Sequence, residues 1–379
     1  MNKSLIFIIL QFTIFTLTGY TQSNKVVISV QNPLPIERNE EVISISWIDI
    51  VSRYPSIDTA NFKIINIASK KELSWQLEHK GEKTIQNLLI QTDLAENCEV
   101  KLELQEGKSQ TFKSKTYGRY VPERKDDFAW ENDKIAFRMY GKALELFPAE
   151  MAYGMDVWVK RTDRLILNER YKRGEYHTDY GDGMDYYQVG LTLGAGDIAP
   201  CVKDSIYFSK NYRRWRVLDN GPLRTTFELE YDEWNVNGAQ VTATKRISLD
   251  AASQLSRVEA RFIYAEKPIL PVGIGLAKRK QPGTMLLDEQ QGIMAYWEPQ
   301  HGEDGITGVG SILCNPVTNI KVTEQQLLAF TSSVNSVPVI YYTGACWNKG
   351  NKITSSKGWF DYLQGFKNCL SSPVKIVVR

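Results

Sequence analysis

Hydrophobic and polar positions alternate along most of the chain, in short stretches that polar turns separate. In the first part the stretches are residues 25–35, 40–47, 62–69, 71–78, 86–93 and 98–107. They are rich in β-branched residues, and their length and spacing are typical of short antiparallel strands. We therefore predict a small N-terminal β-sandwich or barrel over residues 23–116.

The stretches become longer and more aromatic from about Tyr120 onward. Asn132 and Asp133 predict the turn of a hairpin, and residues 219–222 and 235–238 are further turn signals. The pattern predicts a large antiparallel β-supersandwich over residues 117–379. Within it, residues 358–372 predict one short C-terminal helix, residues 322–333 fit a helix or a strand, and residues 373–379 predict a final strand.

Two of the longer stretches separate their residues cleanly onto two faces. In residues 223–231 the odd positions are mostly apolar, whereas the even positions include Arg224 and Glu228. Residues 257–264 repeat the pattern, with Arg257 and Glu259 on the polar face. The polar face is either a solvated surface with cross-strand ion pairs or a concave surface suited to charged sugars, and the sequence leaves both open.

The N-terminus has the pattern of a secretory signal peptide. Lys3 precedes an apolar run from Leu5 to Leu17, which is short for a transmembrane span, and a polar segment follows. We predict a signal peptide over residues 1–22 with cleavage near residues 19–23. The mature protein is then expected to be periplasmic or secreted and not inserted in a membrane. There is no cysteine near the predicted cleavage site, so the sequence does not indicate a lipid anchor.

Composition narrows the function classes. The 379 residues carry a net charge of +2, which does not indicate nucleic-acid binding. The 9 Trp, 19 Tyr and 14 Phe suit strand-rich cores and stacking on sugar rings. The odd number of cysteines leaves at least one unpaired; a disulfide between Cys346 and Cys369 stays open.

Candidate chemistry gathers in residues 175–197, a stretch rich in Asp, Tyr and Gly with little apolar content. We take five of its residues as catalytic candidates: His177, Asp182, Asp185, Tyr186 and Tyr187. A purely structural loop is the alternative. The spacing of Asp179, Asp182 and Asp185 leaves calcium open, although the pattern of an EF-hand is incomplete, and a lone histidine does not indicate a transition metal.

Two other segments supply candidates for substrate binding. Arg213, Arg214 and Trp215, with Arg224 and Glu228 downstream, offer cations for a carboxylate and a ring for stacking. Trp297, Glu298 and His301 lie in a second cluster over residues 296–305, for which an exposed acidic turn is the alternative interpretation. Of these, Trp297 and His301 are taken as substrate-binding candidates.

Several common catalytic motifs are missing, among them the nucleophile elbow, the phosphate-binding loop and the dinucleotide fingerprint. The remaining residue types suit glycoside hydrolysis by a carboxylate pair or β-elimination from a uronide. Neither reaction requires an organic cofactor.

Residues 120–144, 176–196 and 208–234 resemble motifs of a family of exported bacterial proteins, domain of unknown function 4861. The resemblance covers nearly all of the mature chain and implies an association with polysaccharide degradation, often of pectin-like glycans that contain uronic acids. The layout is also similar to exo-acting rhamnogalacturonan lyases and to galactose-mutarotase-like supersandwich proteins.

Together these observations predict a protein that acts on uronic-acid-containing oligosaccharides by β-elimination. His177, Tyr186 or Tyr187 would be the acid or base, and Arg213, Arg214 or Arg224 would neutralise the uronate. A glycan-binding protein without catalysis is the alternative, as is a hydrolase whose carboxylate pair is drawn from Asp182, Asp185 and Glu228.

Overall fold

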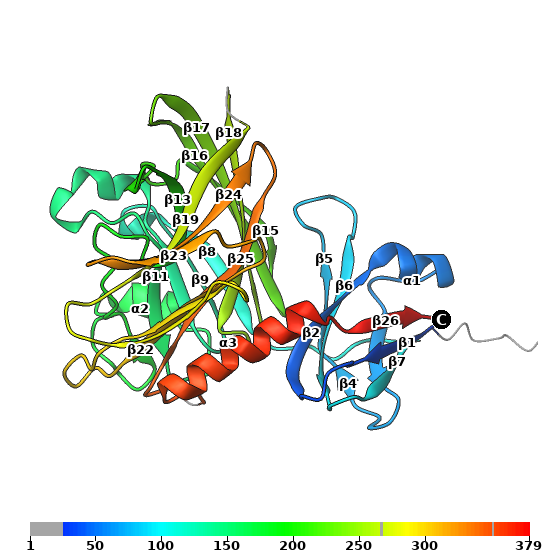
Figure 1. Ribbon diagram of the computed structural model, residues 1–379. Coiled ribbons are helices and arrows are strands. Elements are labelled where there is room, and N and C mark those ends of the chain that lie inside the picture. Colours follow the sequence, from blue (N-terminus) through cyan, green and yellow to red (C-terminus); the bar gives the residue numbers. More distant parts are fainter. Residues whose placement is uncertain (1–25, 266–267, 351) are drawn as a thin grey trace, which may run out of the picture.

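The computed structural model describes residues 26–265, 268–350 and 352–379, and Figure 1 shows a larger and a smaller β-rich unit side by side. The predicted signal peptide at residues 1–22 lies outside the described residues. The mostly-β fold class is confirmed, with antiparallel pairing throughout the named sheets and a helix near the C-terminus.

The smaller unit is a sandwich of two sheets. One has the order β26-β1-β7-β3-β4, formed by Lys375–Val378, Val26–Gln31, Glu99–Glu106, Phe62–Asn66 and Glu72–Leu73. The other has the order β2-β6-β5, formed by Arg38–Ser46, Asn87–Leu94 and Trp75–Glu78. Ile28 and Leu104 of the first sheet share a core with Ile45 and Ile90 of the second. The helix α1 (Trp47–Arg53) adds Ile50 to this core.

The last strand returns to the first. β26 pairs antiparallel with β1, so that Ile376 lies opposite Val30. Residues 375–378, which the sequence pattern groups with the larger unit, are thus part of the sheet of the smaller one. The predicted boundary near residue 116 coincides with the start of β8.

The larger unit contains three antiparallel sheets. The eight-stranded sheet has the order β15-β16-β17-β18-β25-β22-β21-β20, formed by Arg214–Asn220, Arg224–Val236, Ala239–Asp250, Leu255–Tyr264, Val339–Trp347, Thr307–Leu313, Ile293–Trp297 and Thr284–Asp288. A five-stranded sheet has the order β14-β13-β19-β24-β23, formed by Ser205–Ile206, Ala195–Val202, Ile269–Ala277, Gln326–Val334 and Asn319–Val322. A second five-stranded sheet has the order β12-β11-β10-β9-β8, formed by Gly183–Met184, Asp156–Lys160, Ala136–Met139, Asp127–Asn132 and Thr116–Val121. One core joins all three sheets, with Phe227 from the first, Val272 from the second and Trp130 from the third.

The two-faced pattern that the sequence predicts is present in both strands. On β16, Phe227 and Leu229 are fully buried, and on β18 so are Val258 and Ala260. The opposite face of the eight-stranded sheet is covered in part by the predicted helix, α3 (Ser356–Ser371), whose Trp359 is fully buried. The Ser355 side chain caps this helix by accepting a hydrogen bond from the Gly358 N–H.

Other details differ from the sequence pattern or were left open by it. Residues 322–333, which fitted a helix or a strand, mostly form β24, because their apolar positions pair with β19 in the core. The short helices α1 and α2 (Leu167–Arg173) were not predicted, since two turns carry too little periodicity to be recognised. Three short 3-10 turns are Pro122–Arg124, Lys142–Leu146 and Pro148–Glu150. All five cysteines are free, so Cys346 and Cys369 form no disulfide in this structure.

Within the described part of the chain, no helix combines the length and the apolar character that crossing a membrane requires.

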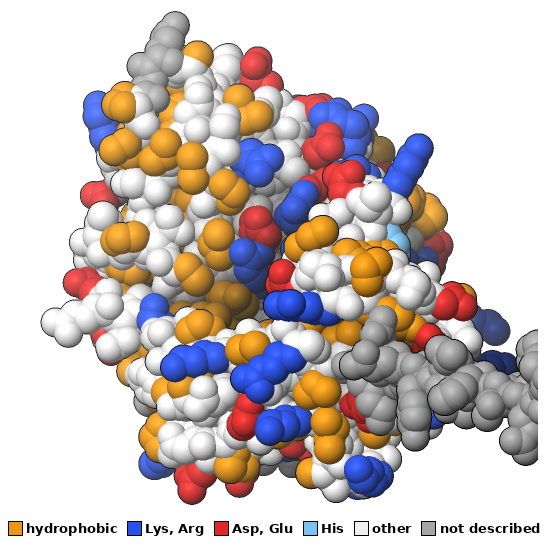
Figure 2. Space-filling model, turned by 90° about the vertical axis from the view of Figure 1, so that its right-hand side faces the viewer, with side chains coloured by type: hydrophobic (Ala, Val, Ile, Leu, Met, Phe, Trp, Pro, Cys, Tyr) orange, Lys and Arg blue, Asp and Glu red, His pale blue; other side chains and the backbone are white. Residues whose placement is uncertain are grey.

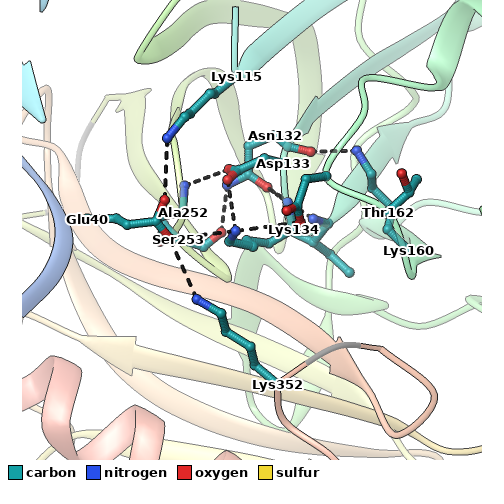
Figure 3. Close-up of polar contacts among 12 residues, drawn as sticks. Glu40, Lys115, Asn132, Asp133, Lys134, Lys160, Thr162, Ala252, Ser253 and Lys352 are labelled. Atoms are coloured by element: carbon teal, nitrogen blue, oxygen red, sulfur yellow. Dashed lines mark hydrogen bonds and ion pairs between the residues drawn. The ribbon is translucent and has the colours of Figure 1, made fainter. Parts of the chain in front are cut away.

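Glu40 connects the two units electrostatically, as Figure 3 shows. It has a positive φ of 54° at an irregularity in the pairing of β2 with β6, so the strand bends there. Its carboxylate lies 3.3 Å from Lys115, 3.7 Å from Lys134 and 3.6 Å from Lys352. Three cations thus surround one carboxylate at the junction. Elsewhere on the surface, Figure 2 shows basic and acidic side chains interspersed on the face that carries the smaller unit.

Candidate functional site

A pocket of about 350 Å³ lies where the ends of several strands of the larger unit meet. Its volume is within the range of small-ligand sites. The described residues that line it are Tyr186, Gln188, Arg279, Gln281, Glu298, Pro299, Gln300, His301 and Gly302. Tyr186 follows β12, Arg279 follows β19 and Glu298 follows β21, so each of the three sheets supplies one functional side chain.

Glu298 is the buried acid of this pocket. It is 5% exposed, and its Oε1 lies 2.6 Å from Nε of Arg279. Burial raises the pKa of Glu298 to about 7, although Arg279 alone would lower it. Its backbone N–H donates to the Thr307 carbonyl at 3.0 Å, which anchors the residue to β22. Glu298 is therefore a carboxyl group that exchanges its proton near neutral pH.

Tyr186 and His301 form the second pair in the pocket. Their rings stack with centroids 5.5 Å apart, and the Tyr186 hydroxyl accepts a hydrogen bond from the Thr307 hydroxyl at 2.8 Å. Burial raises the pKa of Tyr186, so the phenol keeps its proton. Nδ1 of His301 lies 2.9 Å from Oδ2 of Asp304, which favours a proton on Nδ1 and a lone pair on Nε2. The pair therefore combines a proton donor with a proton acceptor.

A buried charge cluster around Arg138 fixes the segment that carries Tyr186. The Arg138 guanidinium hydrogen-bonds to Asp156, and it lies 3.1 Å from Asp185 and 3.7 Å from Asp127. Burial raises the pKa of Asp185 to about 8, with a second contribution from the nearby Asp156. Burial also raises the pKa of Asp127 to about 6. One arginine thus holds three carboxyl groups, and Asp185 is connected to Tyr186 directly along the chain.

The structure separates the catalytic candidates of residues 175–197. Tyr186 lines the pocket, and Tyr187 supports it from behind, because the Arg279 guanidinium lies 4.7 Å from the centre of its ring. His177 does not line the pocket; its side chain is 66% exposed and its Nδ1 lies 2.7 Å from the Asp185 carbonyl. Asp182 is buried beside Arg170 and Arg173.

The three aspartates whose spacing in the sequence is compatible with a calcium site each face a different part of the structure. Asp179 accepts hydrogen bonds from the Gly181 and Gly183 N–H groups and pairs with Arg161 at 2.6 Å. Asp182 and Asp185 face the arginines described above. Across the described residues, no group of three or more His, Cys, Asp or Glu side chains is placed to hold a metal ion.

The predicted substrate-binding residues on β16 and on or just before β15 lie outside this pocket and are paired within the protein. Their partners are Glu145 for Arg213, Glu230 and Asp232 for Arg214, Asp250 and Glu78 for Arg224, and Arg216 and Arg246 for Glu228. Trp215 stacks on Tyr120 at 5.0 Å. In the second cluster, His301 lines the pocket, whereas Trp297 packs in the core beneath α3.

The two charged residues that form the ion pair of the pocket, Glu298 and Arg279, were not among the site candidates. Glu298 was noted beside His301, but its burial was not foreseen. Arg279, in the polar segment after β19, gives no local signal, because its role depends on a partner from another sheet.

One protein matches this chain in sequence over nearly its whole length, and one solved structure is similar to it in fold. The chain is 29% identical over 400 residues, covering 99% of both chains, to "Uncharacterized protein P7" of Formosa agariphila. A solved protein of glycosyl hydrolase family 38 from Enterococcus faecalis superimposes with a TM-score of 0.54 at 8% identity, over 95% of this chain and 48% of the other. An alpha-mannosidase from the same species gives a TM-score of 0.48 at 8% identity, over 94% and 46%. The chain therefore spans about half the length of these solved structures.

The model of one family matches residues 30–376, which is nearly all of the described chain. The match includes all three sheets of the larger unit and most of both sheets of the smaller one, since it begins within β1 and ends within β26. The protein belongs to the family described as Domain of unknown function (DUF4861).

Proposed function

We propose that this protein is a carbohydrate-active enzyme that cleaves uronic-acid-containing oligosaccharides by β-elimination. The observation that carries the proposal is the convergence of a buried Glu298–Arg279 pair and a stacked Tyr186–His301 pair in one pocket. The likeness in fold to a protein of glycosyl hydrolase family 38 supports a carbohydrate as substrate.

The two pairs match the two demands of the reaction. A uronate gives up its C5 proton only when its carboxylate is neutralised, and Arg279 with protonated Glu298 offers a cation and a carboxylic acid for this purpose. His301 takes the C5 proton on Nε2. The electron pair of the C5–H bond forms the C4–C5 double bond as the bond from C4 to O4 breaks, and the leaving oxygen takes the proton of Tyr186.

The proton balance closes within the pocket. His301 ends the step protonated and Tyr186 ends it as a phenolate, and a proton transfer from the imidazolium to the phenolate restores both groups. No water is consumed. The products are an unsaturated uronide and a sugar with a free hydroxyl group.

Hydrolysis fits this pocket less well. Glycoside hydrolysis uses two carboxyl groups on either side of the bond that is cleaved. Among the described residues that line the pocket, Glu298 is the one carboxyl group. The pocket therefore favours elimination over hydrolysis.

The test is incubation of the purified protein with uronic-acid-containing oligosaccharides, following the ultraviolet absorbance of the new double bond. We expect absorbance to rise with wild type and to stay flat with Tyr186→Phe and with His301→Gln. New reducing ends without absorbance would identify a hydrolase. Binding without either product would identify a glycan-binding protein, and both results would contradict the proposal.

We also propose that the protein acts outside the cytoplasm, on the pattern of residues 1–22. N-terminal sequencing of the protein from its native host is expected to begin near residues 19–23. A mature chain that starts at Met1 would contradict export by this route.

A further inference from the structure

A second and larger cavity lies between the two units. This cleft has a volume of about 740 Å³. Its floor is the outer face of β16, β17 and β18, one wall is α3, and residues 36–42 of the smaller unit border it on another side. Among the described residues, none lines both this cleft and the pocket of Tyr186 and His301. The cleft is thus a separate site of ligand size.

The arginines of its floor already have carboxylate partners within the protein. The pairs are Arg224–Asp250, Arg246–Glu228 and Arg257–Glu259. A uronate that bound one of these arginines would have to replace a carboxylate that is already in hydrogen-bonding contact, which gains little. The floor is therefore polar but offers no uncompensated charge, and it suits a ligand that is rich in hydroxyl groups and carries no charge.

Hydroxyl groups and aromatic rings lie between these ion pairs. Thr226 and Ser248 are opposite each other on β16 and β17, with their hydroxyl oxygens 3.0 Å apart. Tyr342 of β25 and Phe366 of α3 meet edge to face at 5.1 Å. The cleft thus combines hydrogen-bonding groups with aromatic surface, which is the combination that a sugar ring uses through its hydroxyls and its apolar face.

We propose that this cleft binds a neutral segment of a glycan chain. The inference rests on the proposed function for the statement that the ligand is a glycan. It adds a second binding site, whose described lining residues are all different from those of the cleavage pocket. Binding here holds the oligosaccharide through its uncharged sugars, whereas the pocket of Tyr186 and His301 acts on the uronate.

Gly365 allows the cleft to be filled without disturbing its walls. It lies in α3 and lines the cleft, and a Cβ atom built at this position meets no heavy atom within 4 Å. Gly365→Trp therefore puts a large side chain into the open space. Gly365→Ala is the matched control, since it adds only a methyl group and favours the helix by up to about 1 kcal/mol.

The experiment is calorimetric titration with neutral galacto- and rhamno-oligosaccharides and, separately, with an oligogalacturonate. We expect wild type, Gly365→Ala and His301→Gln to bind at least one neutral oligosaccharide with similar affinity. We expect Gly365→Trp to bind it at least about tenfold more weakly, a loss that corresponds to about 1.4 kcal/mol.

Two results would overturn the inference: neutral oligosaccharides that do not bind, or binding that Gly365→Trp leaves unchanged. Binding of oligogalacturonate alone, weakened by Gly365→Trp, would overturn the assignment of a neutral ligand. If the elimination assay fails while neutral sugars bind in a way that depends on Gly365, the proposed function is wrong and the cleft site stands.

Discussion

Oε1 of Glu298 lies 2.6 Å from Nε of Arg279, at the ends of two strands that belong to different sheets. An exposed pair at this distance would keep the carboxyl ionised down to acidic pH. Here burial outweighs the arginine and raises the pKa of Glu298 to about 7. The pair is therefore a proton-exchanging group whose state changes within the ordinary pH range, which is common at functional sites.

Glu298→Gln is expected to change the pH dependence of elimination. In wild type the carboxyl must be protonated to donate to the substrate carboxylate, so kcat/KM should fall as pH rises through about 7. The glutamine amide donates at every pH, so this decline should be absent in the variant. The measurement is kcat/KM from pH 5.5 to 9 for both proteins, roughly the range over which the carboxyl changes its charge. An identical decline in the two proteins would contradict the assigned role.

Tyr186→Phe is expected to lower kcat by about 10²–10⁴-fold, the usual contribution of a general acid. The variant also leaves the Thr307 hydroxyl without its partner, which costs about 1 kcal/mol of stability. Tyr180→Phe is the matched control, because Tyr180 lies in the same segment but is 56% exposed. Steady-state kinetics and urea unfolding on both variants separate catalysis from folding. Equal loss of activity in the two would show that Tyr186 has no special role.

Much of the fold could be predicted because many strands show a local alternation of apolar and polar residues in the sequence. Phe227, Leu229 and their even-numbered neighbours fall on opposite faces as period-two spacing requires, and the turn at Asn132 and Asp133 joins β9 to β10. The return of β26 to β1 could not be predicted, since it pairs residues at opposite ends of the chain. Strand pairing over such separations leaves no local pattern.

The site was predictable only in part for the same reason. Tyr186 and His301 were recognisable as polar and aromatic residues in Gly-rich segments. Whether an arginine can bind a substrate carboxylate depends on whether an ionised carboxylate of the protein already neutralises the arginine. Arg213 and Arg224 have such partners from distant segments, Glu145 and Glu78. Their pairing became visible only in three dimensions.

Arg138→Leu is expected to destabilise the protein by about 3–5 kcal/mol, because it leaves buried carboxyl groups without their cation. The loss should be smaller in acid, because burial raises the pKa of Asp127 to about 6 and the pKa of Asp185 to about 8, so both are protonated in the folded protein and less negative charge is left without a partner. Urea unfolding at pH 4.5 and pH 8 measures it, a range spanning roughly the ionisation of these groups. Arg164→Leu is the control, because Arg164 and Glu169 form an exposed pair that contributes about 0–1 kcal/mol. A loss at Arg138 no larger than the loss at Arg164 would contradict the role of the cluster.

Glu40→Gln is expected to weaken the junction between the two units modestly. Burial alone would raise the pKa of Glu40, but Lys134, Lys115 and Lys352 together lower it. A carboxyl whose pKa is lower in the folded than in the unfolded protein adds stability above its unfolded pKa, and this contribution is lost as pH falls through the folded pKa. Because the site is partly exposed, we expect the variant to lose up to about 1 kcal/mol of stability at neutral pH and low salt.

This difference in stability between wild type and Glu40→Gln should shrink in high salt, through screening, and in acid. Thermal unfolding of wild type, Glu40→Gln and the exposed control Glu37→Gln at two pH values and two salt concentrations tests this, and a difference independent of both conditions would show that the lysines contribute nothing through charge.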